Sequence, residues 1–326
     1  MSRVAALRFL SAVALASFAG LVLAQAPPLT KGEWVTKAPV LTKRTEVAVA
    51  AVLGKIYVIG GFVRGIPLVT SAVEEYDPAT DRWRERAPLP TGLHHAGIGV
   101  VHNQLYVVGG FEHALLTIWS PVTSLYEYDP RADRWTARRS MPTPRGALAV
   151  AVVDGKLHAV GGYTQEGNTG AHEVYDPATD SWTTRAPMPT PRDHHAAAAL
   201  GGRLYAIGGR LKRQYSQNLA VTEEYDPTTD RWTRKADLPT ARSGITAAVV
   251  GDRTYVFGGE APAGTFRENE AYHPASNTWE ALAPMPTARH GLGSAVVDGR
   301  LYVLSGGPTP GGSFSDANEM FIPPRR

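Results

Sequence analysis

Histidines gather at three corresponding points of the chain, each just before an apolar stretch. They occur in the segments TGLHHAG, TPRDHHAA and TARHGLG; in alignment His95 matches His194, while His94, Asp193 and His290 share the next position outward. Neutral imidazoles from several segments can bind Zn²⁺, Cu²⁺ or Fe²⁺, and one imidazole can act as a general base. The simpler interpretation, which we favour, is polar filling of strand starts or ordinary ligand contact, with no metal site and no cofactor.

A series of arginines forms the second set of residues with potential chemistry. Each lies 16 residues before the first position of a repeated glycine doublet, and only Leu93 breaks the series. A glutamate recurs two residues before a repeated aromatic residue, which places both on one strand face. Buried charges need partners, so the pattern predicts either structural Arg–Glu contacts or a ring of arginines that face a ligand. The arginines are Arg44, Arg145, Arg192, Arg242 and Arg289; the glutamates are Glu74, Glu173, Glu223, Glu270 and Glu319, with Tyr126 in the second unit.

Short strands must position these residues, because the chain is an internal repeat with a period near fifty residues. Apolar stretches end in Gly-Gly doublets that start at positions 60, 109, 161, 208 and 258, and Ser305 takes the first glycine position of a sixth. Each unit has four short segments rich in Val, Tyr, Trp and Thr and separated by turns, which predicts four strands. Four antiparallel strands repeated radially form the blade of a propeller.

This repeat resembles the kelch family. Its units share the Gly-Gly doublet, a later Tyr, and a Trp seven residues after that Tyr, over about residues 30 to 322. The resemblance implies an all-β, six-bladed kelch β-propeller with four antiparallel strands per blade. The sixth unit has Phe321 in the Tyr position and lacks the Trp, whereas EWVTKAP, with Trp34, matches SWTTRAP of the third unit. We therefore expect the N-terminal strand to complete the last blade and close the ring.

The phrase EEYDPATDRW, which returns in related form in later units, is interpreted as scaffold. Asp77 and Pro78 suit the first two positions of a tight turn, and Asp81 can accept backbone hydrogen bonds where the next strand starts. A calcium loop is the functional alternative, since carboxylates are hard oxygen ligands. It has too few ligands, and the fifth copy has His273 and Asn277 in place of the acids.

Composition and the first residues bear on location and partners. Arg3 and Arg8, the apolar stretch 9–23 and small residues up to Ala26 predict a signal peptide over 1–26, followed by a single propeller domain over 27–326. We expect export, to a bacterial periplasm or by secretion, with no membrane span after cleavage. The net charge of +3 includes Arg3 and Arg8, so +1 remains by subtraction, and no nucleic-acid partner is expected. The chain has no Cys, which excludes thiolate chemistry. Ring closure leaves no free edge, so a monomer is expected.

Function is expected where the units differ. Strand direction alternates, so the loops after the doublets and the PMPTPR-type connections share one face, which varies in length and chemistry and is the predicted binding face. Trp119 is the only Trp outside the repeat; it suits a sugar ring or a protein hot spot, or it caps its own loop. The doublet loops carry Arg64, Glu112, His113, Trp119, Tyr163, Glu166, Arg210, Lys212, Arg213, Tyr215, Glu260 and Arg267.

A binding module is the favoured function, with a protein or glycan ligand or a small acidic sugar as partner, and enzymatic activity is the less favoured prediction. The alternative is a sugar-active enzyme, because some exported kelch propellers of this size resemble the sialic-acid mutarotase (N-acetylneuraminate epimerase) group. Such chemistry would use Arg192 or Arg289 as a carboxylate clamp and His194 as the acid–base residue. The predicted ligand-binding residues are Arg44, Arg64, His95, His113, Trp119, Arg145, Arg192, His194, Arg213, Tyr215, Arg242, Arg289 and His290.

Overall fold

A computed structural model describes residues 31–65, 68–114 and 117–324 of the protein. The predicted signal peptide, residues 1–26, lies outside this part of the chain. The described residues form strands, turns and loops, and among them there is no helix that could cross a bilayer. The expectation of an all-β chain is confirmed.

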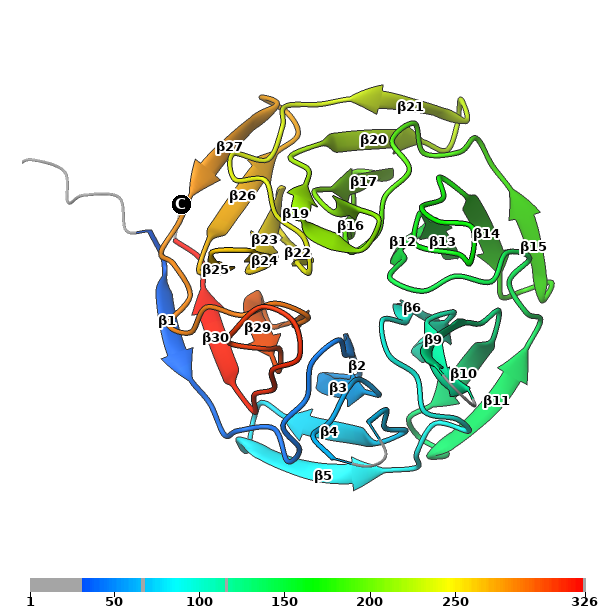
Figure 1. Cartoon of the computed structure of the whole chain (residues 1–326). Coiled ribbons are helices and arrows are strands. Elements are labelled where there is room, and N and C mark those ends of the chain that lie inside the picture. Colours follow the sequence, from blue (N-terminus) through cyan, green and yellow to red (C-terminus); the bar gives the residue numbers. More distant parts are fainter. Residues whose placement is uncertain (1–30, 66–67, 115–116, 325–326) are drawn as a thin grey trace, which may run out of the picture.

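The described residues form six four-stranded antiparallel sheets, arranged radially about one axis as the blades of a propeller (Figure 1). The first strand of each of the first five blades lies innermost and the fourth lies at the rim. Blade 1 contains β2 (Ala48–Val52), β3 (Lys55–Ile59), β4 (Val73–Asp77) and β5 (Arg82–Arg86); blade 2 contains β6 (Gly97–Val101), β7 (Gln104–Val108), β10 (Leu125–Asp129) and β11 (Arg134–Arg138); blade 3 contains β12 (Ala149–Val153), β13 (Lys156–Val160), β14 (His172–Asp176) and β15 (Ser181–Thr184). Blade 4 contains β16 (Ala196–Leu200), β17 (Arg203–Ile207), β20 (Thr222–Asp226) and β21 (Arg231–Arg234); blade 5 contains β22 (Thr246–Val250), β23 (Arg253–Phe257), β26 (Asn269–His273) and β27 (Thr278–Ala281); blade 6 contains β28 (Gly293–Val297), β29 (Arg300–Leu304), β30 (Asn318–Ile322) and β1 (Glu33–Thr36).

Three of the loops that follow the glycine doublets fold into small hairpins of their own. These hairpins project on one face of the propeller, the face that the sequence predicts to be variable (Figure 1). They are β8 (Phe111–Ala114) with β9 (Thr117–Pro121), β18 (Arg210–Leu211) with β19 (Gln214–Asn218), and β24 (Glu260–Ala261) with β25 (Gly264–Thr265).

Small residues in the innermost strands allow the blades to approach one another near the axis. Strand β16 reads AAAAL and β6 begins with Gly97. A Cβ atom added to Gly97 would lie 2.4 Å from the Val150 side chain of the next blade, too close for any real side chain. The second strands are instead almost fully buried and carry the larger residues, because they pack against blades on both sides.

The two ends of the described chain close the ring in blade 6. Strand β1 pairs antiparallel with β30, which places Trp34 opposite Phe321. The rings of these two residues pack with centroids 5.0 Å apart, and the indole Nε1–H of Trp34 donates to the carbonyl of Ala283 in blade 5. Figure 1 shows the blue β1 beside the red β30. Closure of the ring by the N-terminal strand, predicted from EWVTKAP, is confirmed.

The repeated phrase is a joint between blades. In blade 1, Asp81 Oδ1 accepts hydrogen bonds from the Tyr76 hydroxyl at 2.5 Å and from the Ala38 N–H at 2.9 Å. The indole of Trp83 donates to the Ala38 carbonyl at 2.9 Å, so both polar groups of that residue are satisfied by the neighbouring repeat. The same three contacts recur in blades 2 to 5. These contacts are structural, as the scaffold interpretation expects. Asp77 also stabilises the turn, because its carboxylate accepts a hydrogen bond from the Ala79 N–H.

The five repeated arginines lie inside the blades. All five are fully buried, and each forms an ion pair with the repeated glutamate of its own blade. Arg192, for example, binds Glu223 at 2.5 Å and also donates to the carbonyls of Thr190 and Ala206. A guanidinium with these partners satisfies its charge and ties the connection before the blade to strands inside it. These are the structural Arg–Glu contacts that the sequence predicts as one of its two alternatives.

Removal of one of the five repeated arginines is expected to destabilise the fold. Arg192→Met leaves the Glu223 carboxylate buried without its partner, which costs about 3–5 kcal/mol of unfolding free energy. The matched control is Arg234→Met, which removes an exposed pair with Asp237 and costs less than about 1 kcal/mol. Urea denaturation of both variants measures the difference. Equal midpoints for Arg192→Met and wild type would contradict the structural role of the arginine.

The inter-blade joint also predicts a dependence of stability on pH. Hydrogen bonds from the Tyr225 hydroxyl and the Ala186 N–H lower the pKa of Asp230, whereas Asn277 forms the same two bonds in the next blade without a titratable group. A carboxyl whose pKa is lower in the folded state adds stability above its unfolded pKa of about 3.9, and loses it as the pH falls through the folded value. Asp230→Asn should therefore be less stable than wild type at pH 7, with the difference vanishing in strong acid.

Thermal unfolding of Asp230→Asn and of the reciprocal variant Asn277→Asp across this acid range tests the prediction. Asn277→Asp should show the opposite sign, with a gain of stability that is complete above the unfolded pKa and is lost as the pH falls through the folded value. A difference between Asp230→Asn and wild type that stays constant with pH would refute it.

Candidate functional site

Six residues that precede the innermost strands form a closed ring of backbone hydrogen bonds around the axis. The N–H of each ring residue donates to the carbonyl of the ring residue in the preceding blade, and the sixth bond returns to the first blade, with N···O distances from 2.7 to 3.1 Å. Every ring residue has positive φ, although four of them are not glycine. Left-handed backbone costs a residue with a Cβ roughly 1–2 kcal/mol, and such strain tends to occur at functional sites. The ring residues are Glu46, His95, Ala147, His194, Gly244 and Gly291.

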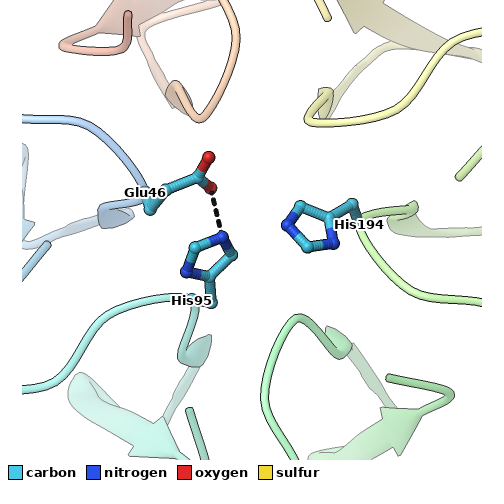
Figure 2. A group of neighbouring side chains, drawn as sticks. All are labelled: Glu46, His95 and His194. Carbon is cyan, nitrogen blue, oxygen red and sulfur yellow. Dashed lines mark ion pairs between the residues drawn. The ribbon is translucent and has the colours of Figure 1, made fainter. Parts of the chain in front are cut away.

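Three ionisable ring residues converge at the axis. Glu46 comes from blade 1, His95 from blade 2 and His194 from blade 4, and their side chains point toward one another across the ring (Figure 2). One ligand atom from each lies within 4.8 Å of the other two. The three side chains expose 11%, 3% and 1% of their area, so their polar groups meet almost without solvent.

The tautomer of His95 follows from a chain of hydrogen bonds. Burial lowers the pKa of His94 to about 3, so its ring is neutral. Its Nε2 must donate to the Ile118 carbonyl at 2.5 Å, because a carbonyl only accepts; its Nδ1 then accepts from His95 Nδ1–H, also at 2.5 Å. His95, whose pKa burial lowers well below its usual value, is left with a lone pair on Nε2, 3.1 Å from Glu46 Oε2.

Asp193 orients the second histidine of the ring. Its Oδ1 lies 2.5 Å from His194 Nδ1, which holds the proton on that nitrogen. Burial lowers the pKa of His194 well below its usual value, so the ring is neutral and its Nε2 carries a lone pair. Within the described part of the chain this buried Nε2 has no hydrogen-bond partner.

Glu46 lies between charged groups of opposite sign. Burial, and after it the negative charge of Glu260, raise its pKa to about 8, and Arg210 opposes both. A proton retained near neutral pH allows the carboxyl to donate to the lone pair of His95. Arg210 is itself held by Glu260 at 2.6 Å and Asp193 at 3.4 Å.

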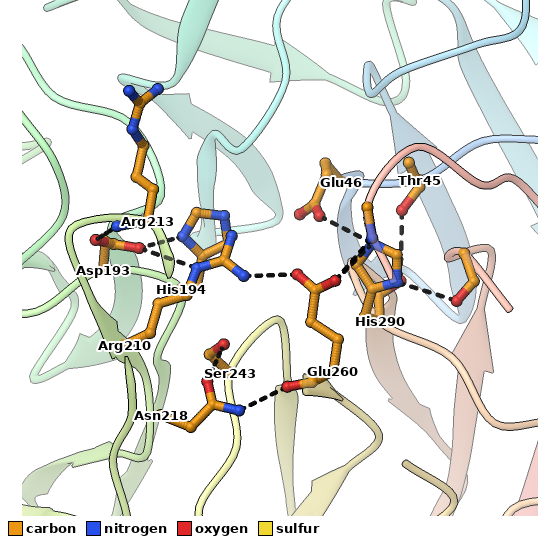
Figure 3. A network of polar contacts seen from close by, with 12 residues as sticks. Thr45, Glu46, Asp193, His194, Arg210, Arg213, Asn218, Ser243, Glu260 and His290 are labelled. Carbon is orange, nitrogen blue, oxygen red and sulfur yellow. Dashed lines mark hydrogen bonds and ion pairs between the residues drawn. The ribbon is translucent and has the colours of Figure 1, made fainter. Parts of the chain in front are cut away.

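His290 completes the network on the side of blade 6 (Figure 3). Its Nδ1 lies 3.1 Å from the Gly307 carbonyl and therefore donates, which leaves the lone pair on Nε2. That Nε2 is 3.7 Å from Glu46 Oε1 and 3.6 Å from Glu260 Oε2. Burial, the largest effect, lowers the pKa of His290. Charged and neutral groups from five blades are thus linked at one end of the axis.

A cavity of about 510 Å³ lies above this network on the variable face, and we call it the loop cavity. Its walls are aromatic and aliphatic side chains from the loops of four blades, and its floor carries Glu46, His95, Arg210, Glu260 and His290. A smaller space of about 200 Å³, which we call the channel, is lined by the hydrogen-bonded ring and the innermost strands. Glu46 and His95 border both spaces, whereas His194 borders the channel. The wall residues of the loop cavity are Phe62, Val63, Leu68, Ile118, Trp119, Tyr215 and Phe314.

Trp119 is both packed and available to the cavity. Its ring lies within 5.9 Å, centroid to centroid, of Phe62, Phe111 and the two histidines at the start of blade 2. The Arg213 guanidinium lies 4.7 Å from the Trp119 ring and 4.6 Å from the Tyr163 ring, so it bridges blades 2, 3 and 4 by cation–π contacts. Both interpretations of Trp119, loop cap and ligand contact, fit this placement.

The predicted ligand-binding residues fall into three groups. His95, Trp119, Arg213, Tyr215 and His290 line the loop cavity, and His194 lies at the ring beneath it. Arg64 and His113 are exposed and border neither space. The repeated arginines are fully buried against their glutamates and border neither space. Arg192 and Arg289 are therefore separated from the cavity in which His194 was expected to act with them. The five are Arg44, Arg145, Arg192, Arg242 and Arg289.

The sequence placed Arg210 and Glu260 on the predicted binding face without counting them among the ligand-binding residues, and Glu46 was missed, although signals for all three existed. Glu46 lies two residues after Arg44, the same register as His194 after Arg192, and extending that alignment to blade 1 would have found it. Arg210 and Glu260 directly follow glycine doublets, where three other blades have Phe or Tyr. The signal is a pair of opposite charges, in two adjacent blades, at the position that is aromatic in three other blades.

Comparison with known proteins gives consistent results. A family model described as the KLHDC2/KLHL20/DRC7 Kelch-repeats domain matches residues 147–322, and the Kelch motif matches residues 43–90 and 92–142. Kelch-like protein 35 of Mus musculus is 28% identical over 136 residues, which are 42% of this chain and 22% of that protein; the match thus spans about a fifth of its length. The solved structure of YjhT aligns with a TM-score of 0.74 and 17% identity over 86% of this chain and 95% of that chain, a likeness of fold.

Proposed function

The chain belongs to the kelch-repeat family, and from this premise we propose that it binds a small acidic sugar in the loop cavity. Kelch propellers serve unrelated activities, so the site and not the fold must carry the argument. The observation that carries it is the loop cavity itself, with aromatic walls above a floor of buried polar groups.

The size and lining of the loop cavity suit one ring-bearing molecule. Ligand cavities commonly enclose about 300–1,000 Å³, with apolar walls and a few placed polar groups, and this one encloses about 510 Å³. The Trp119 and Tyr215 rings offer faces for the C–H groups of a sugar ring. The floor residues Glu46, Glu260 and His290 supply acceptors or donors for hydroxyl groups.

Cations at the rim favour an acidic ligand over a neutral one. Lys212 is exposed and Arg213 is half-buried, and both line the loop cavity. No carboxylate of the described residues lies within ion-pair distance of either side chain. Arg210, in contrast, is already neutralised by two acids. A ligand carboxylate at the rim would thus meet the positive charges of Lys212 and Arg213 in the β18–β19 hairpin. These two residues would take the role of carboxylate clamp that the sequence had suggested for Arg192 or Arg289.

The export and monomeric state expected from the sequence remain part of this proposal. A protein ligand on the same face is the broader form of the binding function, which is common for kelch propellers. We favour the small ligand, because apolar side chains of four blades surround one hollow of about 510 Å³ and do not spread as a flat patch.

Chemistry on the bound sugar is the second candidate function, and one observation favours it. The His194 Nε2 lone pair lies at the channel beneath the loop cavity, where it is buried, has no partner among the described residues and is oriented by Asp193. A nitrogen held in this way can accept a proton or activate an oxygen, which simple binding does not require. Sugar-active chemistry of the mutarotase or epimerase type fits such a group.

The binding proposal predicts loss of affinity when the aromatic wall is removed. Trp119→Ala should weaken binding of N-acetylneuraminate or glucuronate at least about tenfold, because it removes the largest ring surface of the cavity. Arg213→Gln should weaken binding of these acids more than that of neutral glucose. Isothermal titration calorimetry on the folded chain measures each affinity.

His113→Ala and Arg64→Ala are the matched controls, since both residues are exposed on the same face and border neither space. They should bind as wild type does. Absence of heat with every acidic sugar, or affinity that Trp119→Ala leaves unchanged while its melting temperature is normal, would refute the proposal and favour a protein ligand.

The catalytic candidate makes a separate prediction. Addition of the chain should speed exchange between the anomers of N-acetylneuraminate, followed by NMR, and His194→Gln should abolish the acceleration while sugar binding persists. An exchange rate equal to that of buffer would restrict the function to binding.

A further inference from the structure

We propose that Glu46, His95 and His194 form a binding site for one divalent first-row transition-metal ion. This inference goes beyond the proposed function and does not depend on it, since the metal site is formed by the ring and not by the loops. It differs from the expectation drawn from the sequence, which favoured no metal site. The three residues come from blades 1, 2 and 4 and meet only in the closed propeller (Figure 2).

Two nitrogen lone pairs are aimed at the same place. His95 directs Nε2 toward the ring centre because its Nδ1 proton is committed to His94, which is in turn committed to the Ile118 carbonyl. His194 directs Nε2 there because Asp193 holds its Nδ1 proton. A carboxylate or another hydrogen-bond acceptor behind each ligating imidazole is the usual arrangement in metal sites, since it fixes tautomer and orientation.

The second observation is the unsatisfied nitrogen of His194. Only 1% of its side-chain area is exposed, and its Nε2 has no partner among the described residues. A buried polar atom without a partner needs an explanation such as an ion. Several described residues carry such an atom, and His194 is the one that also belongs to a group of potential metal ligands. His158 and His172 show the contrast within the same fold. His172 donates from Nδ1 to the Ala186 carbonyl, and its Nε2 accepts from His158, so that buried pair satisfies itself.

Charge around the ring also favours a cation. Glu46, Glu260 and Asp193 supply three carboxylates, and Arg210 is the cation paired with two of them. If an ion displaces the proton of Glu46, the resulting charge has no compensating Lys or Arg partner among the described residues. A divalent ion beside Glu46 provides that compensation, as buried charges require.

The donor set selects the class of metal. Two imidazoles and one carboxylate are typical of catalytic zinc sites and of iron(II) sites with open positions. Mg²⁺ and Ca²⁺ prefer oxygen ligands and should bind poorly. The ligand atoms lie within 4.8 Å of one another, close to the spacing of about 3–4 Å between atoms bound to one zinc ion.

The geometry allows one ion and leaves room for further ligands. A second group, Glu46 with Glu260 and His290, shares Glu46 with the first, so the two groups are adjacent parts of one site. Glu46 and His95 border the loop cavity as well as the channel. Water or an oxygen of a bound molecule can therefore reach the remaining coordination positions from the variable face.

Calorimetric titration of Zn²⁺ into the folded, EDTA-treated chain, with no sugar present, tests the site. One Zn²⁺ should bind per chain, with no comparable heat from Mg²⁺. Asp193→Asn, which alters the residue that orients His194, should weaken binding about 10–100-fold, and Glu46→Gln and His194→Gln should weaken it more. His113→Ala, an exposed histidine outside the site, should bind as wild type does.

Two further measurements keep the test decisive. Far-ultraviolet circular dichroism checks that each variant is folded, and His194→Gly serves if His194→Gln is not, because glycine suits the φ of 54° at that position. Co²⁺ bound at the site should give visible absorption bands that Zn²⁺ removes. Absence of Zn²⁺ binding, or binding that Glu46→Gln and His194→Gln leave intact, would overturn the proposal. Sugar binding can be measured with EDTA present and Zn²⁺ binding with no sugar present, so either proposal can fail while the other stands.

Discussion

The closed ring of six backbone hydrogen bonds around the axis is the constraint on which the rest of the structure depends. It requires every ring residue, from Glu46 to Gly291, to adopt left-handed backbone and to pass its carbonyl to the next blade. The geometry is the same whether the residue is glycine, which accepts it freely, or histidine, which is strained by it. The backbone geometry by itself therefore brings the side chains of this ring to one place.

Repetition separates the scaffold from the site. Where a residue recurs in nearly every blade, as do the arginines, the glutamates and the Tyr–Asp–Trp joint, it is paired within the scaffold. The site residues instead stand where the register is kept but the residue type changes. Glu46, Arg210 and Glu260 all stand at positions that hold other residue types in other blades.

Burial sets the chemistry of the axis. Exclusion of water favours the uncharged forms, so it lowers the pKa of His95, His194 and His290 and raises that of Glu46. Neutral imidazoles retain the lone pairs that proton transfer or metal binding needs. Aromatic residues in the overlying loops enclose the same space, which joins a polar floor to apolar walls. The two halves of the site come from different parts of each unit: the strand starts and the doublet loops.

The amino-acid sequence by itself determined the repeat, the strands, the number of blades, the closure by β1 and the variable face. These follow from local patterns: doublets, turn residues and alternating strands act over a few residues and recur six times, so each copy supports the others. It also identified His95, His194, His290 and Trp119, because they interrupt the pattern. Only the tertiary structure decided that the repeated arginines are buried with their glutamates, and that Glu46 meets His95 and His194. Such partnerships join residues from separate blades or depend on which side of a strand faces the axis, and no local spacing encodes the distance across a closed ring.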